Sequence, residues 1–466
     1  MLLTIIAGAF VLGVVVLVHE FGHFIVAKWA GVFVKTFSIG FGKKILKWRP
    51  GETEYAICIL PFGGYNKFAG ETEYYDEMEA AGEHPEDDAE LAKKTDEIPD
   101  SEIPRDRYFT TKRPAVRAAI LFGGPFMNYL LAVFLYIGVT WIQGSSVYPT
   151  MTIGEVAAGS AADSVGVLAG DRVLSVDGIE VENWGDITEA LYAEEETIKH
   201  LVIERDGETL EFSCRGKEQD GVYRIGIRAW VPAKVGRVKR GKPAYLAGIR
   251  DGAVIESIND TTIADWDEMR RIINSNPEVP LYIRWQLDGM AHADSITPEA
   301  VKALKPGTMN EFTVVGVIGM SPHYVQRREG LATSIKVGFT AANGMIVRII
   351  QYLGLLFSGK MGVDTLGGPI LITQMAGDVA RWGFDYLLVF LAFFSINLCI
   401  FNLLPLLPFD GGHLVLLGYE AIVGRPINRR LRDIFAQAGF VLIILLMIFV
   451  VMLDLNRCTG SSPGLF

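Results

Sequence analysis

Four apolar segments, each long enough to cross a bilayer, constrain the fold of this chain more than any other feature. A helix needs about 20 apolar residues to span the hydrocarbon core. A further apolar stretch, Met345–Phe357, is shorter and carries Arg348, so we expect an amphipathic helix on the membrane surface there. The sequence therefore predicts four transmembrane helices, at about 3–27, 116–142, 386–404 and 434–453.

Composition supports a membrane protein with soluble parts. Half of the 466 residues are hydrophobic and 21% are charged, a mixture that predicts an α-helical membrane protein joined to soluble domains. The net charge of -11 argues against nucleic acid as a partner. Four scattered cysteines without a C-x-x-C pair predict neither a disulfide scaffold nor a cysteine zinc site. The N-terminus lacks a basic n-region and a cleavage site, so we expect a retained first helix.

Basic residues set the expected orientation. The segment after the first run and the connection between the last two runs are both rich in lysine or arginine, as at Lys43, Lys44, Arg429 and Arg430. The positive-inside rule places both in the cytoplasm. Both termini and the long segment 144–382 are then expected to be extracytoplasmic.

The outer segment contains an internal repeat. Four residues recur at one constant offset, so that Gly166, Gly170, Ser175 and Trp184 match Gly248, Gly252, Ser257 and Trp266. Glycine-punctuated strands followed by a helix resemble the PDZ fold, which predicts two tandem PDZ domains, at 150–230 and 231–322. Such domains bind extended peptides by adding a strand. The alternative is a pair of spacer domains that bind nothing.

The inner connection divides into two parts. Residues 31–70 alternate short apolar runs with glycines, a pattern typical of a β-hairpin, which we expect to lie at the membrane and to hold an unwound substrate. Within the connector 71–115, the stretch Glu71–Glu102 is strongly acidic and poor in apolar residues. It predicts a solvated, partly disordered insert, with a docking role as the alternative.

An H-E-x-x-H motif closes the first apolar run. His19 and His23 are four residues apart, so both project from one helix face and can reach one metal ion. Glu20 lies close enough to take a proton from a metal-bound water. The motif is short and occurs by chance in unrelated proteins. Ionisable groups at membrane depth are costly, however, which favours a functional site.

The third run ends in a broken helix that offers a third ligand. Asp410 follows Pro405 and Pro408 and precedes two glycines, a sequence that disrupts and bends a helix. Irregular backbone at membrane depth requires cover from protein or a water-filled cavity. The predicted orientation puts this break and the first motif at the same inner side of the membrane. Taken alone, Asp410 is also suited to a helix cap or a turn.

Three further polar residues near the break have competing interpretations. His413 is either a rival ligand or a support for the turn. Asn397 and Asn402 are suited to hydrogen bonds between helices. Asn402 lies nearer the break and is the better candidate for holding substrate backbone.

Together these motifs resemble the site-2 protease family of intramembrane zinc metalloproteases, and its bacterial RseP-like branch in particular. The resemblance covers nearly the whole chain and is carried by residues 19–23, 37–42, 61–65, 123–128, 367–370 and 402–412. It implies a zinc metalloendopeptidase of the bacterial inner membrane, with Zn²⁺ as its cofactor. By this resemblance the zinc ligands are His19, His23 and Asp410, and Glu20 is the catalytic base.

The same resemblance implies the substrates and how they are held. Asn402 and the β-loop residues Gly63, Gly64 and Tyr65 would bind substrate. Substrates would be single-span membrane proteins such as anti-sigma factors, or remnant signal peptides, with the PDZ pair acting as a size filter. Two departures stand out, because Pro408 lies one residue later than the family pattern and the acidic insert is longer than usual.

The alternative function is a non-catalytic membrane PDZ scaffold in which a structural zinc ties the helices together. In either case the lipid bilayer is a partner. Besides the segments given above, we expect the first transmembrane region at 1–30 and the second at 116–143. An amphipathic region follows the PDZ domains at 323–384. The third transmembrane region, with the aspartate motif, is expected at 385–416, and the fourth at 434–455.

Overall fold

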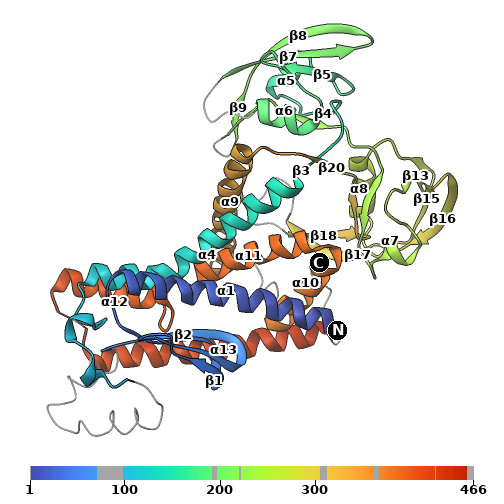
Figure 1. The fold of residues 1–466 in the computed structure, drawn as a ribbon. Coiled ribbons are helices and arrows are strands. Elements are labelled where there is room, and N and C mark those ends of the chain that lie inside the picture. The colour runs from blue at the N-terminus through green and yellow to red at the C-terminus, as the bar shows by residue number, and fades with distance from the viewer. Residues whose placement is uncertain are drawn as a thin grey trace. The chain divides into compact units, whose positions relative to one another are not determined.

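The computed structural model describes residues 2–70, 98–191, 197–219, 222–304, 312–359, 367–425 and 427–458. The chain divides into two compact units, drawn in Figure 1. The first unit comprises Met1–Ile142 and Glu329–Ser461, and the second is Gln143–Arg328, inserted between them. Most of the expected acidic insert, residues 71–97, lies outside the described residues.

The first unit is built mainly of helices. Five helices in the described part of the chain are long and apolar enough to cross a membrane, namely α1, α4, α9, α11 and α13. The bounds are α1 (Leu2–Trp29), α4 (Pro114–Gln143), α9 (Leu331–Phe357), α10 (Pro369–Trp382), α11 (Phe384–Asn402), α12 (Asp410–Val423) and α13 (Arg429–Cys458), with short 3-10 helices η1 (Asp100–Glu102) and η2 (Arg105–Arg107) before α4.

Helix α9 is longer than the surface helix expected over Met345–Phe357. It is continuous over 27 residues and buries a stripe of small residues that includes Gly338 and Ala342. A Cβ atom added at Gly338 would lie 2.4 Å from the Ile137 side chain of α4. Small residues allow close approach of helices in a membrane. The expectation of a short helix was therefore wrong, because it counted only the large apolar residues.

Helices α1, α10 and α11 share one apolar core. Val11 and Val15 of α1 pack with Leu387 and Leu391 of α11 in a cluster that is almost fully buried. Close helix packing of this kind requires small residues where the backbones approach, and a Cβ at Gly8 would lie 2.7 Å from Thr373 of α10. The packing holds α11 against α1.

A buried carboxylate joins α13 to α10. Asp454 is 2% exposed and accepts hydrogen bonds of 3.1 Å from the backbone amides of Gly368, Ile370 and Leu371. These amides belong to the first turn of α10, where N–H groups have no partner inside the helix. The carboxylate therefore caps α10 from a neighbouring helix and offsets the positive end of its dipole.

A two-stranded antiparallel hairpin packs on α1, with β1 (Val34–Trp48) and β2 (Glu54–Phe68) as its strands (Figure 1). Phe24 of α1 contacts Phe37 of β1 with ring centroids 5.2 Å apart, and both belong to one buried cluster. At the base of the hairpin, Lys35 forms a buried ion pair of 2.6 Å with Asp100. That pair ties the described end of the connector to the hairpin.

The second unit holds two four-stranded antiparallel sheets with the same strand order. The first has the order β6-β5-β7-β8 and the second β14-β13-β15-β16. Each is accompanied by two helices at equivalent places in the chain, which confirms the predicted repeat. The bounds are β5 (Arg172–Val176), β6 (Ile179–Glu180), β7 (Ile198–Arg205) and β8 (Glu208–Arg215) with α5 (Ala161–Ser164) and α6 (Trp184–Leu191), then β13 (Val254–Ile258), β14 (Thr261–Thr262), β15 (Leu281–Leu287) and β16 (Met290–Ile296) with α7 (Pro243–Leu246) and α8 (Trp266–Asn274).

Short strand pairs complete the two domains. They are β4 (Ile153–Val156) with β11 (Ile227–Ala229), β9 (Lys217–Gln219) with β10 (Val222–Arg224), β12 (Val235–Val238) with β19 (Met320–Pro322), β17 (Glu299–Leu304) with β18 (Phe312–Val317), and β3 (Ser145–Val147) with β20 (Val325–Arg327). Each domain has its own buried core, and Trp184 packs against both. The β3–β20 pair brings together the two ends of the second unit.

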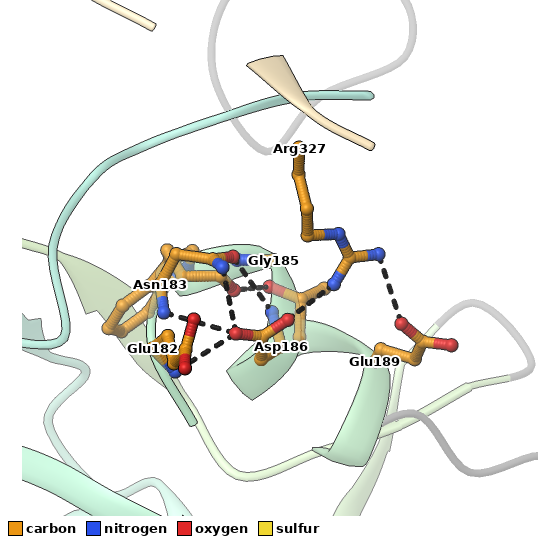
Figure 2. Close-up of polar contacts among 8 residues, drawn as sticks. Glu182, Asn183, Gly185, Asp186, Glu189 and Arg327 are labelled. Atoms are coloured by element: carbon orange, nitrogen blue, oxygen red, sulfur yellow. Dashed lines mark hydrogen bonds and ion pairs between the residues drawn. The ribbon is translucent and has the colours of Figure 1, made fainter. Parts of the chain in front are cut away.

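Arg327, at the end of β20, binds the first domain's helix α6. Its guanidinium contacts Asp186 at 2.6 Å and Glu189 at 3.1 Å (Figure 2). Asp186 also accepts hydrogen bonds from the backbone amides of Glu182 and Asn183 at 2.9 and 3.2 Å. The start of α6 is thus held both by its own cap and by the strand that leads out of the unit.

Candidate metal centre

Helix α1 supplies the two histidines and the glutamate of the H-E-x-x-H motif. Because His19 and His23 are one turn apart, their rings face the same side, with centroids 4.7 Å apart. Each histidine is 7% exposed, and their Nε2 atoms lie 3.1 Å apart. Two neutral imidazoles held this close offer two ligands to one ion.

Asp410 reaches the same place from the other end of the chain. It is the first residue of α12, after the irregular segment that follows α11. Its Oδ2 atom lies 3.3 Å from Nε2 of His19 and 3.5 Å from Nε2 of His23. These three side chains form a potential metal-binding group, with all ligand atoms within 4.8 Å of one another.

The separations of these ligand atoms fit a zinc ion. Zinc bonds of about 2.0–2.2 Å at tetrahedral angles place neighbouring ligand atoms roughly 3.3–3.6 Å apart. The two separations from Asp410, 3.3 and 3.5 Å, lie in this range, and the separation of the two histidine Nε2 atoms, 3.1 Å, is slightly shorter. Three protein ligands leave a fourth position for water, which is the arrangement of catalytic rather than structural zinc sites.

A backbone carbonyl of α4 fixes the proton on His23. Nδ1 of His23 lies 2.9 Å from the carbonyl oxygen of Ile120, which can only accept, so Nδ1 donates and Nε2 keeps its lone pair for the metal. Glycines in both helices allow α1 and α4 to come this close together. A Cβ at Gly22 would lie 2.2 Å from the carbonyl oxygen of Gly123, and one at Gly124 would lie 2.3 Å from Nε2 of His23.

Two asparagine amides surround His19. The Asn402 amide lies 3.1 Å from Nε2, and the Asn128 amide lies 3.4 Å from Nδ1. Asn128 is fully buried, and as drawn its Oδ1 has no hydrogen-bond partner among the described residues. Amide oxygen and nitrogen are assigned from their hydrogen bonds. We therefore assign Oδ1 to the side of His19, where it accepts the Nδ1 proton and leaves Nε2 for the metal.

The hairpin covers Glu20. Gly64 of β2 lies so close that a Cβ atom there would be 2.8 Å from Cγ of Glu20. The amide of Asn66, two residues later, donates to Oε2 of Glu20 at 2.9 Å and to the Glu20 backbone carbonyl at 2.8 Å. The carboxylate beside the metal ligands is therefore held by β2.

The hairpin and helix-break residues singled out from the sequence differ in their relation to this site, and of the two hairpin glycines it is Gly64 that lies against Glu20. In the hairpin, Gly64 pairs with Ile39 and Tyr65 with Ser38, while Gly63 has a φ of +98° and so adopts a conformation that favours glycine. His413 is not part of the group of metal-ligating side chains found in the described residues. The amide of Asn397 donates to the carbonyl of Phe393 in its own helix.

Sequence reasoning did not identify Asn66 or Asn128 as site residues. Asn128 was noted only within the motif at the start of the second helix. A signal was present for Asn128, which is an amide inside the otherwise apolar and aromatic segment 125–131. The partners of the two asparagines, Glu20 and His19, are 46 and 109 positions away and become visible only through the packing.

A separate cavity of about 520 Å³ lies in the first domain of the second unit. One wall is α6, with Ile187 and Leu191, and the other includes the start of β11 and the segment before it. Strand β11 pairs with β4. The cationic side chains of the lining are Lys217, Arg224 and Arg228.

A candidate zinc site of two histidines and an aspartate, two of them on a helix long enough to cross a membrane, is what a membrane metallopeptidase requires, and the comparisons agree. The model of Peptidase family M50 matches residues 7–446, so this chain belongs to that family, the site-2 protease family of zinc metalloproteases. The chain is 31% identical over 465 residues to the regulator of sigma-E protease RseP of Salmonella typhimurium, covering 96% of this chain and 97% of that protein.

A second relative is similar over nearly the whole chain. The regulator of sigma-E protease RseP of Escherichia coli is 31% identical over 469 residues, with 96% of this chain and 97% of that protein covered. A solved PDZ domain from Listeria monocytogenes is 21% identical, covers 20% of this chain and 90% of that chain, and has a TM-score of 0.16. The two domains of the second unit share one strand order with each other.

Proposed function

We propose that this protein hydrolyses peptide bonds in or near the transmembrane segments of single-span membrane proteins. The observation that carries the proposal is the meeting of His19, His23 and Asp410, with ligand atoms at zinc-ligand spacing, beside the carboxylate of Glu20. In this proposal the three residues hold Zn²⁺ and Glu20 is the base.

The proposed mechanism divides the work between the ion and the side chains. When bound, zinc supplies a Lewis acid that lowers the pKa of a water and polarises the scissile carbonyl. Glu20 takes the proton from the attacking water and then passes it to the leaving amine. The Asn402 amide lies at the metal side of His19, where it can donate to the oxygen of the carbonyl under attack.

A transmembrane substrate must unwind before it can react, since a helix hides its carbonyls in internal hydrogen bonds. We propose that the hairpin holds the unwound segment as an added strand, through the part of β2 at Gly63, Gly64 and Tyr65. Two observations support this. Gly64 lies against Glu20, and the left-handed φ of Gly63 interrupts the regular hairpin there.

We further propose a protein of the bacterial inner membrane with four complete spans, both termini outside and the metal centre near the cytoplasmic side. Helix α9 then enters the membrane from outside and α10 returns the chain to that side. The packing of α10 supports the return, because Thr373 lies at Gly8 and, further along α10, Gly377 lies at Thr4, near the start of α1.

The substrates we propose are anti-sigma factors or proteins of that kind, since the relatives are named regulators of sigma-E. Remnant signal peptides are the second candidate. The cavity beside α6 supports a peptide-binding role for the first PDZ domain, in addition to a size filter formed by the pair. The competing function, a non-catalytic scaffold with a structural zinc, has no use for a carboxylate held beside an open ligand position.

Replacing Glu20 with glutamine tests the proposal. Glu20→Gln should abolish cleavage of a single-span substrate by the full-length protein in membranes, while the zinc content stays the same. The inactive variant should also retain uncleaved substrates, which identifies them by mass spectrometry. Cleavage at the normal rate by Glu20→Gln would exclude the role given to Glu20, and an absence of bound zinc in the wild type would exclude the metal site.

A further inference from the structure

We infer that Asn66 is a positioning residue that holds Glu20 in the orientation needed for proton transfer. This inference rests on the proposed function, because it assigns Glu20 the part of the base. It adds to that function a residue of the hairpin that acts through Glu20.

The hydrogen bonds of Asn66 point to this role. One amide nitrogen donates to two oxygens of the same residue, to Oε2 of the Glu20 carboxylate at 2.9 Å and to the Glu20 backbone carbonyl at 2.8 Å. Both partners are acceptors, so the nitrogen of the amide must face Glu20. The two bonds fix the side chain of Glu20 relative to its own backbone.

A base on a flexible side chain needs such a support. Glutamate has three rotatable bonds, and beside a metal ion its carboxylate can turn to bind the ion itself. With Oε2 engaged by Asn66, Oε1 is left to meet the attacking water. Gly64 limits the Glu20 side chain from another side, because a Cβ atom added at Gly64 would lie 2.8 Å from Cγ of Glu20.

Only the donor half of the Asn66 amide has a partner. Its Oδ1 atom is buried and has no hydrogen-bond partner among the described residues. A residue selected for packing alone would not keep an amide here, since a buried unpaired acceptor is unfavourable. The N–H groups are therefore the feature that this position retains.

The arrangement links substrate capture to the base. The proposed substrate strand would add to β2 near Gly64, and Asn66 is two residues further along the same strand. Substrate capture and the support of the base would thus fall on the same strand.

Two substitutions test the role of Asn66. Asn66→Leu removes the donors at similar size, and Asn66→Asp replaces them with a second carboxylate facing Glu20. A misplaced catalytic group costs about a hundredfold in rate. We expect Asn66→Leu to lower kcat by about that factor and Asn66→Asp by more, with KM and zinc content unchanged. Asn397→Leu, which removes another amide from the same unit, should retain the wild-type kcat.

A normal kcat for Asn66→Leu would overturn the inference, as would a loss explained by raised KM or lost zinc. Failure of the proposed function would look different, since Glu20→Gln would then remain active or the wild type would cleave nothing. If the proposed function fails, the contact between Asn66 and Glu20 can still be tested by measuring unfolding temperatures. Asn66→Leu should lower the unfolding temperature less in the Glu20→Gln background than in the wild type, because the charged partner is gone. Equal losses in both backgrounds would also overturn the inference.

Discussion

The two histidines of the proposed zinc site are held by different kinds of partner. His23 donates to a backbone carbonyl, which every residue at position 120 would supply. The Asn128 amide lies 3.4 Å from Nδ1 of His19, so under the amide assignment made above His19 relies on a side chain, Oδ1 of Asn128, to accept its Nδ1 proton. A substitution can remove the side-chain partner of His19, but it cannot remove the backbone partner of His23.

Asn128→Leu should therefore weaken zinc binding. Loss of a partner that orients a ligating histidine lowers metal affinity by about ten- to a hundredfold. The measurement is competition with a chelator of known affinity, using the full-length protein. Asn343→Leu is the matched control, since Asn343 is an amide in α9 that contacts Tyr129. Equal zinc affinity in the wild type and Asn128→Leu would contradict the assignment of Oδ1 to His19.

At the residue scale, the sequence pointed to the candidate metal ligands and missed the asparagines that contact the site. His19 and His23 follow from helical spacing, and Asp410 from a helix break at matching depth. Their meeting within 4.8 Å agrees with that prediction. Asn66 and Asn128 could not be predicted, because an amide shows its role only when its partner is known.

Helix α6 is the element on which the cavity in the first domain of the second unit depends. It forms one wall, yet it has only eight residues and is too short to be stable alone. Arg327 contributes two ion pairs to it, and both partners, Asp186 and Glu189, lie on α6 (Figure 2). The helix is thus stabilised by a strand from the far end of the unit.

Arg327→Gln should loosen α6 without unfolding the domain. Hydrogen bonds to charged groups contribute about 1.5–3 kcal/mol, and partial exposure reduces this toward about 1 kcal/mol. Amide hydrogen exchange in Trp184–Leu191 should then become roughly fivefold faster, while α8 is unchanged. Arg270→Gln is the control, because its pair with Asp267 is exposed. Unchanged exchange in α6 would show that Arg327 contributes nothing to its stability.

At the element scale, patterns with a strong repeat were predicted well. The spacing of Gly166 and Gly248 led to two similar domains, and both sheets have the same order. Helix α9 was predicted too short, since the buried residues of its first half are small ones such as Gly338 and Ala342. The connection of α10 to Asp454 could not be foreseen, because a single acid in a helix does not reveal which N-terminus it caps.

On the scale of the whole molecule, the metal centre joins parts of the first unit that are far apart in sequence. His19 is in α1 and Asp410 is in α12, with the entire second unit between them in the chain. Zinc bound to folded protein stabilises only the unit that contains its ligands. The two units are therefore expected to respond differently to metal removal.

Chelation should destabilise the first unit alone. Stabilisation by bound zinc is about 4 kcal/mol when free zinc exceeds Kd by a thousandfold. Two buried thiols report on the units, Cys399 in α11 and Cys214 in β8. Burial raises the pKa of Cys214 to about 11, so it reacts slowly until its domain opens. After chelation, Cys399 should be labelled at a lower temperature and Cys214 at the same one. A parallel shift of both would contradict independent units.

The pairing of β3 with β20 has a consequence for how such proteins diversify. Because Ser145 lies directly opposite Arg327, the inserted unit leaves the helices and returns to them at neighbouring points, only one strand spacing apart. A short turn could bridge that gap at little entropic cost. Exchange, duplication or deletion of the inserted unit at these two points would therefore leave the helices on either side of it at their present spacing.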